Sequence, residues 1–268
     1  MKIYDCITFY NENFLTNARF EILNDVVDYF IVSESKYDHS GKKKKKNFYL
    51  INQKFKNKVR YILIKDNFPN TRDPWSSESY QRERIFDGLY DALPDDLIMY
   101  SDSDEIPDPN VLKNITLNKK FGIFMMKFFS YKINIFNKYN SPWEGTKICK
   151  RKDLTSFTFL RKKIRKDNLK KPFWKFYIEK NIELFNKAGW HFNNLYTPAI
   201  ISSKLKAFPH TEFSGNEFSS VKVIKKKIQT YQDLFNRNHM YNKIKINNDY
   251  PKFIINNLKK FKKYIEPY

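Results

Sequence analysis

The chain has 268 residues, of which 41% are hydrophobic and 18% aromatic, so it can build a core and is not a disordered or fibrous protein. Its formal net charge is +21, and the basic excess lies in residues 42–60, 161–180 and 221–268, while the rest of the chain is mildly acidic. Such stretches attract polyanions, whether nucleic acid, an anionic membrane or phosphorylated substrates. With only Cys6 and Cys149, the chain has neither a disulfide framework nor a Cys-x-x-Cys zinc pair.

Short apolar runs alternate with helical patterns over the first hundred residues, which is typical of parallel strands joined by helices. We expect strands over 3–9, 29–33, 59–64 and 97–100. Apolar residues spaced by four predict a helix over 14–27. A second helix is expected to begin at Ser76 or Ser77 and to end before Pro94.

The second half of the chain is expected to add two strands and to end in helices. Apolar runs predict strands over 121–129 and 131–136, and helical patterns return at 217–235 and 253–264. The basic segment 161–175 has little periodicity and is interpreted as a flexible loop. We find no internal repeat and no linker, so the sequence predicts one α/β domain with a C-terminal helical extension.

An acidic turn follows the strand expected over 97–100. Asp102 and Asp104 precede Pro107 and Pro109, which we expect to stop sheet pairing at this point. In open α/β sheets ligands bind outside the carboxyl ends of the strands, and two carboxylates on a turn can converge on one hard cation, Mg²⁺ or Mn²⁺. Such a cation could bridge a nucleotide diphosphate and neutralise its charge as it leaves. The alternative is that both acids are solvated on a loop.

Six segments, spread over nearly the whole chain, carry a family resemblance. In chain order they are Asp5-Cys6-Ile7-Thr8-Phe9-Tyr10-Asn11-Glu12, Val26-Val27-Asp28-Tyr29-Phe30-Ile31-Val32-Ser33-Glu34-Ser35, His39-Ser40-Gly41, Tyr80-Gln81-Arg82, Ser101-Asp102-Ser103-Asp104-Glu105-Ile106-Pro107, and Gly189-Trp190-His191-Phe192. Each segment is unspecific by itself. Together, and in this order, they resemble glycosyltransferase family 17.

The resemblance implies a fold and a reaction. The fold would be a GT-A-like α/β domain, with a mixed, mostly parallel sheet flanked by helices. Residues 1–110 would bind the nucleotide sugar, and 111–268 would bind the acceptor and include the C-terminal helices. The reaction would be the metal-dependent, inverting transfer of a sugar from a donor such as UDP-GlcNAc to a glycan hydroxyl, with Mn²⁺ or Mg²⁺ as the cofactor.

The resemblance also implies metal ligands. Asp102 and Asp104 would form the Asp-x-Asp pair, with Asp104 as the direct ligand and Asp102 reaching the ribose or a metal-bound water. His191 would be a third ligand or would contact the diphosphate; otherwise it is a hydrogen-bonded core residue. Glu105 belongs either to the site or to the solvated surface.

Further residues are expected at the donor. Glu12 and Glu34 follow the first two strands, so in a parallel sheet they share an edge with the acidic turn. Glu34 suits binding of the nucleoside. The alternative for Glu12 is that it only places a negative charge in the first turn of the next helix. Arg82 would bind diphosphate oxygens in a fork, or pair with Glu78 on the surface. Trp190 would form a platform for the sugar, or pack in the core.

An inverting transfer needs a carboxylate that takes the proton of the acceptor hydroxyl. The sequence offers two candidates, Glu212 in Phe208-Pro209-His210-Thr211-Glu212 and Glu144 in Pro142-Trp143-Glu144-Gly145-Thr146. The alternative is that each is an ordinary loop acid. The sequence does not decide which of them is the base.

We find neither a signal-peptide pattern nor 18 consecutive uncharged apolar residues, and therefore expect a cytoplasmic protein without a transmembrane segment. Phe173, Trp174 and Phe176 are interleaved with lysines, which would suit peripheral contact with an anionic membrane.

Two other functional classes compete with a transferase. One is a non-catalytic basic module that binds nucleic acid or an anionic membrane. No sequence signature of an RNA- or DNA-binding fold supports it, and we expect no nucleic-acid partner. The other is a metal-dependent phosphoryl-transfer enzyme or nuclease that uses the same acids, for which the chain lacks a glycine-rich phosphate loop.

Overall fold

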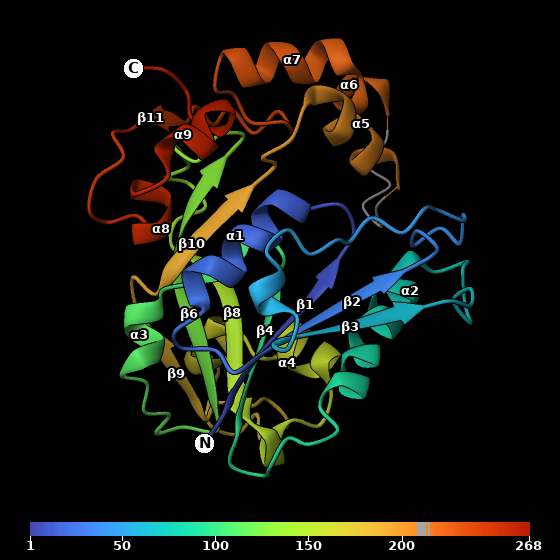
Figure 1. The fold of residues 1–268 in the computed structure, drawn as a ribbon, viewed down its shortest axis with the longest axis vertical. Coiled ribbons are helices and arrows are strands. Elements are labelled where there is room, and N and C mark those ends of the chain that lie inside the picture. The colour runs from blue at the N-terminus through green and yellow to red at the C-terminus, as the bar shows by residue number, and fades with distance from the viewer. Residues whose placement is uncertain (208–212, 214) are drawn as a thin grey trace.

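The computed structural model describes residues 1–207, 213 and 215–268, and helices flank its central sheet (Figure 1). The main path of the sheet has the order β11-β7-β6-β8-β4-β1-β2-β3. Its N-terminal part consists of four parallel strands, β1 (Ile3–Phe9), β2 (Tyr29–Ser35), β3 (Val59–Ile64) and β4 (Leu97–Asp102). Strand β1 lies between β2, which follows it in the sequence, and β4, which comes later. The order of the strands therefore reverses at β1. Ligands of such sheets bind outside the carboxyl ends of the strands at this reversal, here between β1 and β4.

The remaining strands make the sheet mixed. They are β5 (Glu105–Pro107), β6 (Phe121–Ser130), β7 (Ile135–Phe136), β8 (Trp143–Lys150), β9 (Ile182–Phe185), β10 (Gly189–Asn193) and β11 (Asn242–Lys243). Strand β8 runs antiparallel to both β4 and β6, whereas β9 and β10 run parallel to β6. This arrangement confirms the expected α/β class with a mixed sheet.

Helices connect and cover these strands (Figure 1). The α-helices are α1 (Asn13–Leu23), α2 (Pro74–Glu83), α3 (Pro109–Lys113), α4 (Phe157–Lys163), α5 (Pro198–Ala207), α6 (Asn216–Ser219), α7 (Val221–Gln229), α8 (Lys252–Ile255) and α9 (Leu258–Phe261). Short 3₁₀ helices are η1 (Gln53–Phe55), η2 (Arg84–Gly88), η3 (Arg151–Asp153), η4 (Lys166–Lys170) and η6 (Lys262–Tyr264). None of the helices in the described ranges combines the length and apolar character needed to cross a bilayer.

The two faces of the sheet bury separate apolar clusters, because successive side chains of a strand point to opposite faces. In β4, Leu97 and Met99 belong to the cluster that includes α1, α8 and α9. Ile98 and Tyr100 belong to the other cluster, together with residues of η2 and α4. A third, smaller cluster lies among α5, α7 and the segment that follows α7. The C-terminal helices therefore have apolar contacts of their own.

Several element boundaries differ from those expected. Helix α2 begins at Pro74, because the side chain of Asp73 accepts hydrogen bonds from the first free N–H groups and proline suits the first helical position; Ser76 and Ser77 already lie inside the helix. The helix expected over 14–27 ends at Leu23. Tyr131 has a positive φ of 69°, which ends β6 and leaves only Ile135–Phe136 of the strand expected over 131–136.

The C-terminal helices are also shorter than the sequence pattern suggests. Ser220 is extended, with a ψ of 129°, and separates α6 from α7 within the helix expected over 217–235. Tyr231 then adopts a positive φ of 52°, which ends the helical path after α7. The helix expected over 253–264 is divided into α8, α9 and η6. Helical periodicity predicted the buried faces but not these breaks.

Two expectations about the acidic turn and the basic segment were wrong. The prolines do not stop sheet pairing, because Pro107 is the last residue of β5, an edge strand whose one partner among the described strands is β10. At an edge, the missing N–H of proline costs no ladder hydrogen bond. The expectation of a flexible loop over 161–175 is wrong for 161–170, because α4 and η4 occupy most of these residues, whereas 171–175 form turns. Ser156 caps α4 by accepting from the backbone N–H of Phe159.

A buried arginine joins the elements beneath the acidic turn. Arg19 of α1 donates from Nε and Nη2 to the two carboxylate oxygens of Asp5, each at 2.6 Å, and both side chains are almost fully buried. Its Nη2 also donates to Ser101 Oγ at 2.8 Å, and Nη1 donates to the carbonyl of Glu105. Ser101 Oγ lies 2.6 Å from Thr146 Oγ1 of β8. One guanidinium thus holds together α1, β1, β4 and β5, and Ser101 extends the network to β8.

Replacing Arg19 by Met should reduce the free energy of unfolding by about 3–5 kcal/mol, because it leaves the Asp5 carboxylate buried without its cation. Lys152→Met is the control, since Lys152 and its partner Asp95 are both more than half exposed and an exposed pair contributes about 1 kcal/mol or less. Urea unfolding of both variants measures the difference. Equal losses would contradict the role given to Arg19.

Candidate active site

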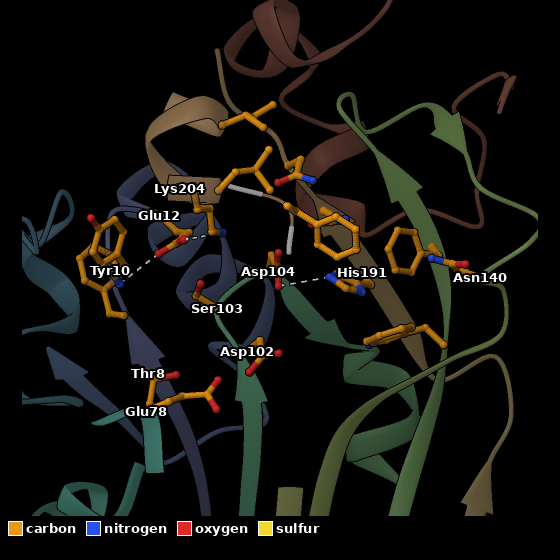
Figure 2. Close-up of a pocket in the computed structure, with 18 of the residues that line it drawn as sticks. Thr8, Tyr10, Glu12, Glu78, Asp102, Ser103, Asp104, Asn140, His191 and Lys204 are labelled. Atoms are coloured by element: carbon orange, nitrogen blue, oxygen red, sulfur yellow. Dashed lines mark hydrogen bonds and ion pairs between the residues drawn. The ribbon is translucent and has the colours of Figure 1, made fainter. Parts of the chain in front are cut away.

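A cavity of about 580 Å³ opens at the carboxyl ends of β1 and β4 (Figure 2). We call it the main cavity. Its polar lining residues include Thr8, Tyr10, Glu12, Glu78, Asp102, Ser103, Asp104, Asn140, His191 and Lys204. Glu12, Asp102, Asp104 and His191, which the sequence predicted as site residues, therefore line one cavity although they come from three separate parts of the chain.

Asp104 and His191 face one another in the main cavity (Figure 2). His191 Nε2 lies 3.3 Å from Asp104 Oδ1, and the backbone N–H of Phe192 donates to the carbonyl of Asp104 at 2.9 Å. Burial opposes ionisation of both groups, but each stabilises the charge of the other. As a result, the pKa of Asp104 falls to about 2 and that of His191 rises. The pair is a buried carboxylate next to an imidazole, and each group favours the charged form of the other.

Asp102 occupies a different electrostatic setting. Its side chain remains 43% exposed at the end of β4. Its enclosure in the cavity raises its pKa to about 6, with Glu105 and Asp104 adding repulsion and Arg161 opposing it. Three carboxylates thus lie close together, and a cation that binds here would relieve their repulsion.

Arg161 is a site residue that sequence analysis did not identify. It extends from α4, and its guanidinium donates to Asp102 and, at 2.8 and 3.0 Å, to both carboxylate oxygens of Glu105. Glu105 is fully buried and also accepts from Trp143 Nε1 at 2.7 Å, so it does not belong to the solvated surface. The basic composition of 161–175 suggested a solvated loop, and nothing in its spacing separated Arg161 from its neighbours.

Lys204 is the second site residue that sequence analysis did not identify. It reaches from α5 to Glu12, with 3.2 Å between Nζ and Oε1 (Figure 2). The other carboxylate oxygen of Glu12 accepts from the backbone N–H groups of Asn11 and Tyr10 at 2.9 and 3.1 Å. Burial disfavours both charges, but Glu12 and then Asp104 raise the pKa of Lys204. The cavity thus has a cation on the α5 side.

Three predicted donor residues, Glu34, Trp190 and Arg82, do not line the main cavity. Glu34 is fully buried, and its carboxylate accepts from Lys44 Nζ, the N–H groups of Asn47 and Phe48, and Tyr61 Oη, at 2.7 to 3.0 Å. It secures the segment after β2 against the sheet. Trp190 is buried in the core, and its Nε1 donates to the carbonyl of Asp249 at 2.8 Å.

A second cavity of about 650 Å³ adjoins the main one and shares Glu78, Asp102, Asn140 and Trp143 with it. We call it the basic cavity, because its lining also includes Arg82, Lys147, Arg161, Lys162, Arg165 and Lys166. Arg82 is buried rather than on the surface. It pairs with Glu78 at 3.1 Å and donates to Tyr100 Oη at 3.1 Å, while its Nη1 has no hydrogen-bond partner within the described residues.

Glu144 lies in the basic cavity, and its carboxylate already contacts positively charged side chains. Its Oε2 accepts from Lys147 Nζ at 3.2 Å and from the backbone N–H of Lys166 at 3.1 Å, and Arg165 Nε is 3.2 Å away. Burial raises the pKa of Glu144, but Lys147 and the other donors outweigh it and lower the value. The other candidate base, Glu212, lies outside the described residues.

We also searched for clusters of metal-ligating side chains. In the part of the chain that the structure describes, no three histidine, cysteine, aspartate or glutamate side chains come together as a metal-binding group. Asp102 and Asp104 each contribute a carboxylate to the main cavity. His191 Nε2 faces Asp104, and its buried Nδ1 has no partner among these residues.

The sequence of the chain is similar to that of a known protein family. The family model described as "Glycosyltransferase family 17" matches residues 1–267. The rat and human proteins named β-1,4-mannosyl-glycoprotein 4-β-N-acetylglucosaminyltransferase are each 34% identical to this chain over 117 residues. That match covers 40% of this chain and 22% of each relative, so it spans about a fifth of the relatives' length.

The solved structures whose backbone partly superposes on this one have low sequence identity to it. HddC from Yersinia pseudotuberculosis is 12% identical, with a TM-score of 0.39 over 73% of this chain and 92% of its own. Glucosyl-3-phosphoglycerate synthase from Mycobacterium tuberculosis, in complex with Mn²⁺, UDP and glucosyl-3-phosphoglycerate, is 13% identical, with a TM-score of 0.35 over 69% of each chain.

Stability should depend on pH through Lys147. Burial lowers the pKa of this residue from 10.5 to about 8, against the opposing pull of Glu144. Between these values the unfolded chain binds a proton that the folded chain does not, so stability rises with pH. Urea unfolding at intervals from pH 8 to 9.5 should show a smaller rise in Lys147→Met than in the wild type. Lys150→Met, which removes a one-third exposed neighbour on β8, should keep the wild-type rise. A slope unchanged by Lys147→Met would refute the assignment.

Proposed function

The chain belongs to glycosyltransferase family 17, and from this premise we propose that its main cavity transfers a sugar from a nucleotide-sugar donor to a hydroxyl of a glycan. The donor we propose is UDP-GlcNAc, and the transfer is an inverting displacement assisted by Mn²⁺ or Mg²⁺. Residues 1–110 contribute the donor side of the cavity and 111–268 the acceptor side.

One observation carries the proposal. Asp102 and Asp104 stand together at the end of β4, beside β1, where an α/β sheet of this order binds its ligand. They share the cavity with Glu12 and His191, which come from two other family segments. Four residues from three distant parts of the sequence thus meet at the place where a diphosphate and a sugar would have to lie.

The donor set fits a divalent cation. Asp102 and Asp104 supply carboxylate oxygens, the ligands that Mg²⁺ and Mn²⁺ prefer, and burial, with a smaller contribution from neighbouring carboxylates, raises the pKa of Asp102. When bound, the cation would neutralise charge on the departing diphosphate. Asp104 would be the direct ligand, with Asp102 as the second carboxylate. Lys204 adds positive charge to the same cavity from α5.

The sugar would lie on the aromatic side of the cavity. The rings of Phe128 and Trp143 both pack against His191, with centroids 4.3 and 5.1 Å from the imidazole and 5.3 Å from one another, and both line the cavity. Such rings give the apolar face of a sugar a flat surface. Asn140 and Asn193, which also line the cavity, offer amides for its hydroxyl groups. GlcNAc is our choice of sugar because the names of the rat and human relatives specify an N-acetylglucosaminyl group, and UDP is the carrier that the family resemblance implies.

The catalytic base must be a carboxylate that is free to take a proton. Glu144 is engaged by Lys147, Arg165 and a backbone N–H, and its lowered pKa makes it a weak base. We therefore propose Glu212, whose neighbour in the sequence, Phe213, lines the main cavity.

Donor binding should raise the melting temperature only when the cation is present. At a hundredfold excess over Kd, a ligand of the folded state adds about 2.7 kcal/mol, which for a chain of this size is about 5–10 °C. We expect this shift with UDP-GlcNAc and Mn²⁺ in the wild type, and its loss in Asp104→Asn.

The matched control is Asp95→Asn, which removes a surface carboxylate that pairs with Lys150 and Lys152. This variant should keep the full shift. An equal shift in Asp104→Asn, or a shift that does not need Mn²⁺, would count against the metal assignment. Hydrolysis of phosphodiesters without sugar transfer would instead support the phosphoryl-transfer alternative.

Replacing Glu212 by Gln should lower the rate of sugar transfer by about 10²–10⁴-fold, because the proton acceptor is lost. The thermal shift with UDP-GlcNAc should persist, since donor binding does not need the base. Glu144→Gln is the comparison, and initial rates measured across a panel of glycan acceptors decide between the two. A loss confined to Glu144→Gln would reverse the assignment.

A further inference from the structure

The segment from residue 169 to 178, which we call the aromatic loop, exposes a cluster of large apolar side chains. The exposed fractions are 42% for Leu169, 77% for Phe173, 61% for Trp174, 85% for Phe176 and 82% for Tyr177. Soluble proteins rarely expose contiguous apolar surface of this kind unless it binds something. The loop lies outside both cavities, so neither of them accounts for it.

The aromatic loop is tied at its base. Lys180 Nζ donates to the carbonyl of Pro172 at 2.5 Å, and Asn168 Nδ2 donates to the carbonyls of Lys163 and Glu179 at 2.7 and 3.0 Å. These bonds join the start of the loop to its end and to α4. The aromatic rings are therefore presented to solvent by a closed loop that is fixed to the body of the protein.

All charged side chains of the aromatic loop are positive. Lys170, Lys171 and Lys175 are the only charged residues between Asn168 and Ile178, and Lys170 and Lys171 are exposed. A second copy of the chain would bring like charges together. A carbohydrate partner would call for carboxylate or amide groups among the rings, and the loop has none. Aromatic rings beside lysines suit the boundary between anionic headgroups and acyl chains.

We propose that the aromatic loop docks the protein on an anionic phospholipid bilayer. The rings of Phe173, Trp174 and Phe176 enter the interfacial layer, while the lysines contact the headgroups. The proposal does not depend on the reaction in the main cavity.

The loop also adjoins the basic cavity. Arg165 and Lys166 line that cavity just before the loop begins, and the backbone N–H of Lys166 donates to the Glu144 carboxylate. Docking through the loop thus places this side of the basic cavity toward the bilayer.

Sedimentation with vesicles tests the proposal on the whole chain. The protein should sediment with phosphatidylcholine vesicles that contain about one third phosphatidylglycerol, and less so as salt is added. Lys170→Gln/Lys171→Gln should bind about 25-fold more weakly, because each lysine near such a surface contributes about fivefold. Phe173→Ser/Phe176→Ser should weaken binding at least about tenfold. Lys225→Gln/Lys226→Gln, which removes the same charge from the exposed side of α7, should keep most of the binding.

Trp174 provides a readout of insertion. Lipids brominated in the acyl chains should quench tryptophan fluorescence in the wild type and in Trp75→Phe, but much less in Trp174→Phe. Melting curves that match the wild type show that the exposed substitutions leave the fold intact.

Three outcomes would overturn the proposal. The first is absence of binding, or equal binding to vesicles of pure phosphatidylcholine. The second is a loss of binding in the lysine variant but none in the phenylalanine variant, which would indicate attraction to any polyanion, including nucleic acid. The third is a concentration-dependent dimer that Phe173→Ser/Phe176→Ser abolishes, which would assign the loop to a second copy of the chain.

Discussion

The guanidinium of Arg19 is the contact on which the site depends. It is buried between Asp5, Ser101 and the carbonyl of Glu105, directly beneath the turn that carries the two acids of the main cavity. A buried charge is tolerated only where its hydrogen bonds are satisfied, so the ends of β1, β4 and β5 must meet at this point. The turn can then hold its carboxylates at the mouth of the sheet without support from solvent.

Charge pairing organises the cavity above this network. Asp104 faces His191, Asp102 faces Arg161, and Glu12 faces Lys204, so each acid has a cation of its own. These partners come from β10, α4 and α5, three different elements of the second half of the chain. The acids follow strands of the parallel half, and the cations that face them come from the mixed half. The site thus lies where the two halves of the chain meet, which is also where two substrates would have to meet.

The sequence identified the residues whose position follows from strand order. Asp102, Asp104 and Glu12 stand at or just after the ends of strands, and the carboxyl ends of parallel strands meet at one edge of the sheet. Glu34 stands at such an end as well, yet its carboxylate turns to Lys44, Asn47 and Phe48, because the loop after β2 folds back over it.

The amino-acid sequence by itself determined the α/β class, the parallel strands and the acidic turn, because apolar periodicity and strand ends are local properties of the chain. Only the tertiary structure decided which cations face those acids. Arg161 lies 59 residues beyond Asp102, and Lys204 lies 192 residues beyond Glu12. Within basic segments their spacing does not distinguish them from solvated lysines and arginines. The difference is made by burial next to a carboxylate, which depends on how α4 and α5 pack and has no local sequence pattern.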